Sequence, residues 1–266
     1  MKTFFLGLPL LILMACNNDD KGTAGNKKKE KEMTPQVEAL QQRVQQHPDS
    51  TALRMKLAME LDSLNMYKPA LEQMDSLIKK DSSNYGFWFT RGQVNDHAGD
   101  TLNAMKDYAT AINIYASPDA LLSLANLYAE QKNARSLLLC SRVKSMGLGR
   151  DYDASSAFIA GIYNARIRQK DLALNLFDEC ISNDYTYMPA YIEKGLVYFD
   201  AKQYGQALDV FSFAANVNHL YPDAYYYMGR CYELMNKKDS AVFYFKQSLA
   251  LDKESAQTEA ALKRVE

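Results

Sequence analysis

The sequence has few of the residues that build metal sites or covalent cross-links. Its 266 residues include three histidines and four cysteines. The cysteines beyond Cys16 are far apart and form no Cys-x-x-Cys pair: Cys140, Cys180 and Cys231. This spacing predicts neither a disulfide framework nor a zinc site, and we interpret the three thiols as small buried apolar groups. No histidine has a second ligand at helical spacing, so no metal is expected.

The chain also lacks an excess of charge of either sign. Its net charge is -1 at pH 7, whereas a protein that binds nucleic acid through the phosphates needs a concentrated basic surface. Nucleic acid is therefore not expected as a partner.

Catalytic motifs are missing as well. The sequence contains no Gly-x-Ser-x-Gly elbow, and Gly147-Leu-Gly149 falls between two expected helices, where glycine normally ends a helix instead of holding a phosphate. We therefore predict a protein that is not an enzyme, has no catalytic residues and uses no cofactor.

The longest apolar run is at the N-terminus. After the basic Lys2, residues 4–14 are apolar, about eleven residues, which is too few to span a bilayer and typical of a signal peptide. The run ends in Leu13-Met14-Ala15-Cys16, which resembles the lipobox of bacterial lipoproteins. The resemblance implies cleavage before Cys16 and attachment of acyl chains such as palmitate to it. An ordinary secretory signal followed by a chance cysteine is the alternative.

The residue that follows Cys16 favours anchoring in the outer membrane over the inner membrane. Several acyl chains on Cys16 would anchor the protein stably, because each buried methylene contributes about 0.8 kcal/mol. In lipoproteins of this type an aspartate after the cysteine favours the inner membrane, whereas here Asn17 follows. We expect a lipid-anchored protein of the bacterial outer membrane, with the periplasmic face favoured over the cell surface. The polar, lysine-rich and glutamate-rich residues that follow predict a flexible linker.

A period of thirty-four residues runs through most of the remaining chain. A glycine recurs at this interval, followed by an alanine twelve residues on and a phenylalanine four residues beyond that. Ala58 and Gly92 continue the register towards the N-terminus, with Met74 and Tyr108 at the ring position, while the copy around Ala125 is weaker. The full matches are Gly161, Gly195 and Gly229; Ala173, Ala207 and Ala241; Phe177, Phe211 and Phe245.

This pattern resembles the tetratricopeptide repeat, in which an aromatic residue, Leu-Gly, Tyr, Ala and Phe recur over thirty-four residues. The best matches to its first half are residues 88–92, 191–198 and 225–232. The resemblance implies an all-α fold, a right-handed superhelical solenoid of antiparallel helix pairs. The expected organisation is a signal peptide at 1–15, a lipid-anchored linker at 16–35 and a solenoid at 36–266, with an extra helix at 36–50, repeats at 51–84, 85–117, 118–151, 154–187, 188–221 and 222–255, and a cap at 256–266.

The recurring small residues have a packing role in this interpretation. Helices approach closely only where the side chains at their crossing are small, so we expect Gly195 and Ala207 at a crossing and Phe211 in the space beside it. Helix starts are marked by aspartates in the turns before second helices and by prolines at the first positions of first helices. These residues are Asp100, Asp171 and Asp239, and Pro118, Pro189 and Pro222.

The resemblance also implies an inner face, lined by fixed positions of the first helices, that commonly holds a peptide. Those positions are apolar with scattered charges, which suits an amphipathic helix or an extended segment of a partner. The alternative is that the apolar members only pack in the core. The candidate contacts are Phe89, Gln93, His97, Asn126, Phe158, Ile162, Arg166, Leu196, Phe199, Tyr226 and Arg230.

Two functions are favoured by the sequence, and a hydrolase whose active site is assembled across the solenoid is a third possibility. The first is a non-catalytic scaffold or adaptor, tethered to the outer membrane through Cys16, that binds a protein component of an envelope assembly in its groove. The alternative is a surface-exposed lipoprotein that captures a ligand or glycan for a transporter, with the aromatic residues stacking on sugar rings.

Overall fold

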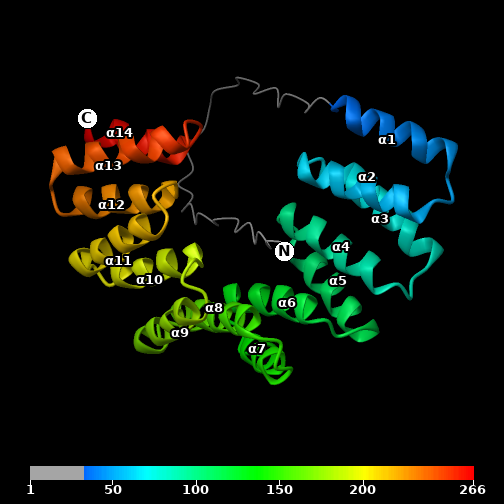
Figure 1. The fold of residues 1–266 in the computed structure, drawn as a ribbon, viewed down its shortest axis with the longest axis horizontal. Coiled ribbons are helices and arrows are strands. Elements are labelled where there is room, and N and C mark those ends of the chain that lie inside the picture. The colour runs from blue at the N-terminus through cyan, green and yellow to red at the C-terminus, as the bar shows by residue number, and fades with distance from the viewer. Residues whose placement is uncertain (1–32) are drawn as a thin grey trace, which may run out of the picture. The chain divides into compact units, whose positions relative to one another are not determined.

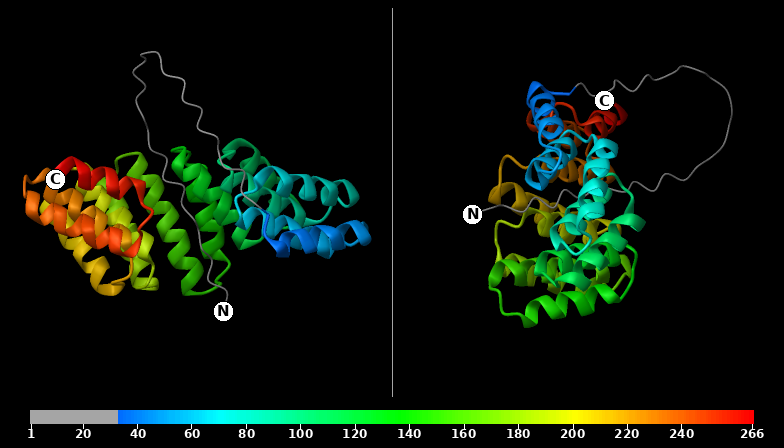
Figure 2. Two further views of the ribbon diagram at one scale, coloured as in Figure 1. Left: turned by 90° about the horizontal axis from the view of Figure 1, so that it is seen from above. Right: turned by 90° about the vertical axis from the view of Figure 1, so that its right-hand side faces the viewer.

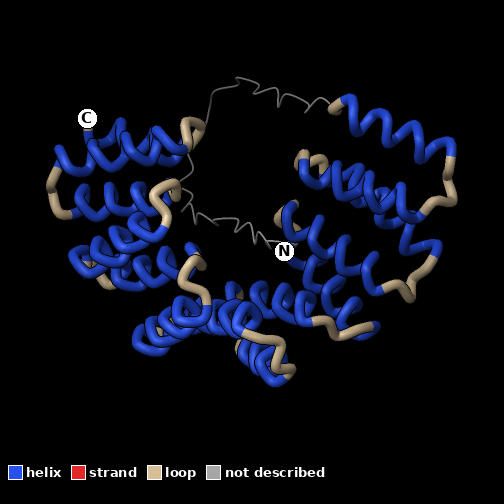
Figure 3. The backbone as a smooth tube through the Cα atoms, viewed as in Figure 1, coloured by secondary structure: helices blue, strands red, loops and turns tan. Residues whose placement is uncertain are grey.

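The computed structural model describes residues 33–266, and every regular element in this range is an α-helix (Figure 1, Figure 3). The predicted signal peptide, Cys16 and the linker up to residue 32 lie outside the described residues. No helix of the described part has both the length and the apolar character that a membrane crossing requires. The helices are α1 (Pro35–Gln46), α2 (Thr51–Ser63), α3 (Tyr67–Lys80), α4 (Tyr85–His97), α5 (Thr101–Ile114), α6 (Pro118–Glu130), α7 (Arg135–Ser145), α8 (Arg150–Arg166), α9 (Lys170–Asn183), α10 (Met188–Asp200), α11 (Tyr204–Val217), α12 (Pro222–Leu234), α13 (Lys238–Leu251) and α14 (Ala256–Val265).

The described residues divide into two compact units, 33–120 and 121–266, and the boundary falls inside α6. In the first unit α2 packs against α3 and α4 against α5. In the second unit α8 packs against α9, α10 against α11, and α12 against α13 (Figure 2). The first helices of successive pairs also touch, since α2 contacts α4, α8 contacts α10 and α10 contacts α12. The predicted all-α fold of stacked helix pairs is confirmed.

The start of α8 differs from the predicted repeat boundary. The helix begins at Arg150, four residues before the boundary expected at 154. Gly149 precedes it with a φ of 101°, a backbone conformation that glycine adopts without strain, and Asp151 and Asp153 lie in its first turn. Acidic side chains near a helix N-terminus interact favourably with the helix dipole, which accounts for the additional turn.

In the pairs α8–α9, α10–α11 and α12–α13, which we call the regular pairs, the glycine of the first helix lies directly beneath the ring that follows it sixteen residues later. A Cβ atom added to Gly161 or Gly229 would lie 2.6 Å from the ring of Phe177 or Phe245, and one added to Gly195 would overlap the ring of Phe211. All of these rings are fully buried. The contacts confirm the packing role of the small residues and refine it, because the ring fills the space above the glycine of its own pair.

The expected helix-start signals are present in part. Asp100 caps α5 by accepting a hydrogen bond from the backbone N–H of Asn103 at 3.2 Å. Asp171 and Asp239, by contrast, lie inside the first turns of α9 and α13 and make no capping hydrogen bond. These two helices begin two residues earlier than they would if the aspartates were N-caps, so the carboxylates act through the helix dipole. The prolines lie within the first two positions of their helices, at Pro118, Pro189 and Pro222.

The turn inside each helix pair has one residue in the left-handed backbone region. In the pair α4–α5 this residue is Gly99, with a φ of 77°. In the other pairs the position is held by residues that carry a side chain, for which this conformation is unfavourable. These are Asn65, Lys132, Arg168, Lys202 and Asn236, with φ between 55° and 63°.

Candidate functional site

The predicted contact residues lie on the first helices of the pairs, and we call the face that carries them the first-helix surface. In the first unit it includes Phe89, Gln93 and His97 of α4. In the second unit it extends over the neighbouring helices α8, α10 and α12, together with the part of α6 that begins at residue 121.

Burial separates the predicted residues into two groups. Phe158 and Ile162 of α8 are 1% and 0% exposed, and the ring of Phe158 packs against Phe177 and Tyr187 at centroid distances of 6.0 and 5.0 Å. They belong to the core, which is the alternative that the sequence left open. The remaining residues reach solvent to some extent: Phe89, Gln93, His97, Asn126, Arg166, Leu196, Phe199 and Arg230 are exposed or half-buried, and Tyr226 is 5% exposed.

In the first unit, His97 forms the polar part of the surface. Its Nδ1 lies 2.8 Å from Oδ2 of Asp62 on α2, and this hydrogen bond raises the pKa of His97. Phe89, about two helical turns further towards the N-terminus, stacks on Tyr85 at a centroid distance of 5.7 Å and contacts Tyr108. The hydrogen bond between His97 and Asp62 links α2 to α4, and both helices contribute side chains to the same face.

In the second unit, Arg166 connects three first helices. Its guanidinium donates to both carboxylate oxygens of Glu130 on α6, at 2.8 and 3.1 Å, and to those of Glu193 on α10, at 3.1 and 3.3 Å. Paired bonds of this kind hold an arginine in a fixed orientation. The arginine side chain remains about one third exposed.

Glu193 is a buried partner of Arg166 that the sequence did not predict. It is 4% exposed, and burial raises its pKa while the charge of Arg166 opposes the rise. The sequence signal was weak because Glu193 precedes Lys194 and reads as part of a solvated pair, and because its partner is twenty-seven residues away. A buried carboxylate at a helix position of this type is nevertheless rare without a cationic partner.

The second polar group of this unit surrounds Arg230 on α12. Its guanidinium lies 5.8 Å from the ring centroid of Phe199 and donates a hydrogen bond of 3.1 Å to the hydroxyl of Tyr226. Glu233 binds both Arg230, at 3.0 Å, and Arg264, at 2.7 Å. The predicted residues Phe199, Tyr226 and Arg230 are therefore brought together in one cluster, which we call the Arg230 cluster.

The thiols do not contribute to this surface as reactive groups. Burial raises the pKa of Cys140 and of Cys231 to about 12, and it raises the pKa of Cys180 as well. All three thiols are protonated at neutral pH, and a protonated thiol is a poor nucleophile and metal ligand. Among the described residues no group of three or more His, Cys, Asp or Glu side chains could hold a metal ion.

The first-helix surface has the side chains of a protein-binding face. Arginine and aromatic residues are enriched at the centres of protein interfaces, where they supply much of the binding energy. The Arg230 cluster combines both types, and its arginine keeps a partly exposed side chain. Such an arrangement can hold a peptide by cation–π, apolar and hydrogen-bond contacts.

The comparisons with known proteins agree with this fold. Family models described as tetratricopeptide repeat match residues 30–115 and 222–255. A search of the curated proteins finds no match.

Several solved structures have the same fold. A tetratricopeptide repeat protein from Parabacteroides merdae superimposes with a TM-score of 0.73 at 16% identity, covering 86% of this chain and 90% of that one. PilW, described as a widely conserved type IV pilus biogenesis factor, gives a TM-score of 0.66 at 18% identity, covering 80% of this chain and 98% of that one. Yeast Tom70 gives 0.57 at 15% identity, covering 86% of this chain and 57% of that one.

The family follows from three observations together. The family models match at both ends of the described helices. The helix pairs recur with the thirty-four-residue register, and in four of them the glycine packs beneath a buried ring, at Gly92, Gly161, Gly195 and Gly229. The chain is therefore a member of the tetratricopeptide repeat family.

Proposed function

We propose that this protein is a non-catalytic scaffold that binds a protein partner on the first-helix surface and is tethered to the bacterial outer membrane by acyl chains on Cys16. The observation that carries the proposal is the Arg230 cluster, in which an arginine is held between aromatic rings and is still accessible. Held in place by Glu233, the guanidinium loses little conformational freedom on binding.

The chemistry of the surface indicates the kind of segment that binds. Leu196 and Phe199 on α10 provide half-buried apolar contacts next to the charged groups. The arginines are each paired with glutamates, so the surface does not present uncompensated positive charge. This combination favours an amphipathic helix or an extended peptide with apolar side chains over a highly acidic tail.

An envelope role is supported by the lipobox at residues 13–16 and by the fold that the chain shares with PilW, a type IV pilus biogenesis factor. A tethered scaffold of this kind would hold the components of an assembly near the membrane. The periplasmic side is the more favourable location, because a partner in an envelope assembly would be encountered there.

Partner binding is tested by crosslinking and affinity purification from the native envelope. Arg230→Ala should reduce recovery of the specific partner about tenfold or more, as expected for an interface hot spot. The matched control is Phe213→Ala, which removes an aromatic side chain that is 56% exposed on the second helix α11. Undiminished recovery with a correctly folded Arg230→Ala variant would contradict the assignment of the surface.

The anchor is tested separately from the binding surface. Cys16→Ala should move the protein from the membrane fraction to the soluble fraction, because the acyl chains provide the attachment. Density-gradient fractionation of the wild type distinguishes the outer from the inner membrane, and protease treatment of intact cells distinguishes the surface from the periplasm. Persistent membrane attachment of the Cys16→Ala variant would refute the lipid anchor.

A further inference from the structure

A hydrogen bond recurs at the start of the first helices. In four repeats, the residue four positions before the small residue of the helix crossing donates to the carbonyl oxygen six positions before itself. In three of these repeats the donor belongs to an aromatic ring, which fills the space above the preceding turn. The pairs are Arg54 with Pro48 at 3.1 Å, Trp88 with Ser82 at 2.8 Å, Tyr191 with Tyr185 at 3.0 Å and Tyr225 with His219 at 3.1 Å.

In α8 this position is occupied by Ala157, which has neither a ring nor a donor. A second substitution accompanies it: Ala160 stands where α10 has Lys194, whose Nζ binds Asp178 of the preceding helix at 2.6 Å. Both large side chains that close the junction between α9 and α10 are therefore missing from the junction between α7 and α8.

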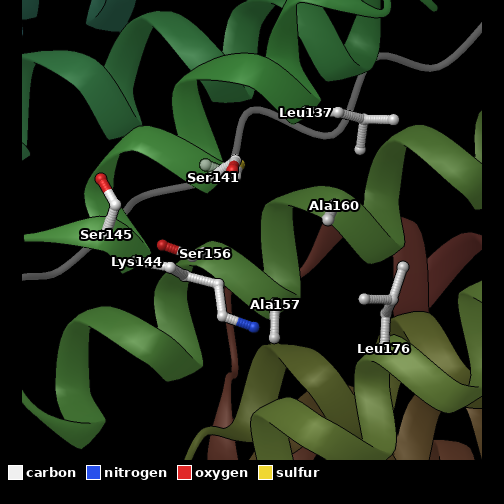
Figure 4. A pocket seen from close by; sticks show the side chains of 9 residues that line it. Leu137, Ser141, Lys144, Ser145, Ser156, Ala157, Ala160 and Leu176 are labelled. Atoms are coloured by element: carbon white, nitrogen blue, oxygen red, sulfur yellow. The ribbon is translucent and has the colours of Figure 1, made fainter. Parts of the chain in front are cut away.

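The missing side chains leave a hollow between α7, α8 and α9, which we call the ring pocket (Figure 4). Its volume is about 530 Å³, whereas the equivalent hollow between α9, α10 and α11, which Tyr191 and Lys194 line, has about 270 Å³. The walls of the ring pocket are mainly apolar. They include Leu137 and Cys140 of α7, Ala157 and Ala160 of α8, and Leu176 of α9.

A buried hydroxyl in the wall lacks a partner. Ser156 lines the ring pocket and is 1% exposed, and its Oγ makes no hydrogen bond within the described part of the chain. Leaving such a group unpaired is unfavourable, so a ligand that bonds it would bind more tightly than a purely apolar one. Lys144, the only charged residue lining the pocket, is paired with Glu179 at 2.5 Å, which disfavours an anionic ligand.

We propose that the ring pocket binds the side chain of a tyrosine or tryptophan from a protein partner, whose phenol or indole group bonds the hydroxyl of Ser156. The ring would take the place that the chain fills with its own ring in the junctions of Trp88, Tyr191 and Tyr225. Leu138, on the same helix as one wall, is 71% exposed, and a bound protein segment would cover it, whereas a free small molecule would not. This site involves helices and residues other than the Arg230 cluster and does not depend on it.

Protection of Cys140 provides a direct assay on the full chain in lipid nanodiscs. Its thiol lines the ring pocket, and its labelling by N-ethylmaleimide at alkaline pH can be followed by mass spectrometry of the peptide. The side-chain analogues p-cresol and 3-methylindole should slow this labelling at about millimolar concentration, as expected for ligands of this size. Cys231, whose pKa is raised to the same value by burial, is the internal control and should be unaffected. No slowing at Cys140, or equal slowing at both thiols, overturns the pocket.

Two variants and a donor-free ligand test the chemistry. Ala157→Tyr should fill the pocket from within, so that Cys140 labelling no longer responds to p-cresol, while Leu138→Ala should respond as the wild type does. Toluene should require at least about tenfold higher concentration than p-cresol, because it cannot bond Ser156. Equal potency of toluene overturns the role of the hydroxyl, and an undiminished response in a folded Ala157→Tyr variant overturns the location.

The protein origin of the ring is tested in cells. A photo-crosslinking amino acid at Leu138 should give a product whose attachment point lies next to a tyrosine or tryptophan of the partner, and Ala157→Tyr should abolish this product. Protection by p-cresol without any such crosslink overturns the assignment to a protein side chain. Loss of the crosslink with Ala157→Tyr but not with Arg230→Ala separates this site from the first-helix surface.

Discussion

Two regions of the second unit follow the same repeat register and pack differently. In α10–α11 the ring of Phe211 covers Gly195, and both residues are fully buried. In α7 the residue at the same sequence offset is Ser141, which is exposed, and the small side chain of the neighbouring Cys140 is buried instead. The comparison shows that the thirty-four-residue repeat does not by itself ensure that side chains fill the space between helices. The large side chains at the right positions close it, and where they are absent the structure retains a hollow.

Removing the ring of the regular pair should produce the largest effect. Phe211→Ala leaves a cavity in a fully packed crossing and should reduce the free energy of unfolding by about 3 to 5 kcal/mol. Ser141→Ala, at the equivalent position of α7, should change it by less than about 0.5 kcal/mol because the side chain is exposed. Urea denaturation followed by circular dichroism measures both. Similar losses for the two variants would show that the regions do not differ in the proposed way.

Arg166 should matter next, because it ties α6 to α8 and α10 beside the irregular repeat. Arg166→Ala leaves the buried Glu193 without its cation and should cost about 2 to 4 kcal/mol at neutral pH. The pKa of Glu193 is already raised by burial and would rise further. A carboxyl with a raised folded-state pKa is less destabilising at low pH, so the loss should shrink as the pH falls towards 4.

The test of this pair is a double substitution. Glu193→Gln in the Arg166→Ala background removes the buried charge and should recover part of the lost stability. A cost that is the same at pH 7 and pH 4, with no recovery by Glu193→Gln, would mean that the arginine acts only through packing.

A smaller effect is expected at the glycine of the regular pair. Gly195→Ala places a methyl group into the ring of Phe211 and should cost about 1 to 3 kcal/mol through overpacking. Gly205→Ala in α11 is the matched control, because a Cβ there meets no atom within 4 Å. Because Gly205 is the second residue of α11, helix propensity should stabilise this variant by at most about 0.5 to 1 kcal/mol. Thermal unfolding compares the two variants, and the same sign for both would argue against the steric explanation.

The smallest effect concerns the hydrogen bond that α8 lacks. Tyr191→Phe removes the bond to the carbonyl of Tyr185 and keeps the ring, so it should cost about 0.5 to 1.5 kcal/mol. Equilibrium unfolding in urea is sensitive enough to detect this. A neutral result would indicate that the ring, not its hydroxyl, closes the regular junction.

The helix pairs could be predicted from the sequence because their packing rule is local. A glycine and a ring sixteen residues apart face each other across one turn, so the requirement for a small residue appears at a fixed offset, as with Gly161 and Phe177. The burial of Phe158 could not be predicted in the same way. It occupies the same repeat position as the half-buried Phe89, and what covers it is Tyr187 from another part of the chain.

The charged part of the surface depends on contacts between distant positions. Glu193 joins Arg166 across twenty-seven residues and Arg166 joins Glu130 across thirty-six, and no sequence rule fixes such partners. The ring pocket has a visible signal in retrospect. Ala157 breaks a position that carries a donor side chain in four other repeats, but the meaning of that position appears only when its hydrogen bonds are known.

The left-handed turns have a practical consequence for handling the protein. Lys132, Arg168 and Lys202 each hold a backbone conformation that costs about 1 kcal/mol or more for a residue with a long side chain. Replacing these residues by asparagine or glycine should therefore raise the melting temperature of the protein, because the backbone strain at the turns would be relieved. Because the three turns lie outside both proposed binding sites, such a thermostabilised variant should bind the same partners as the natural protein.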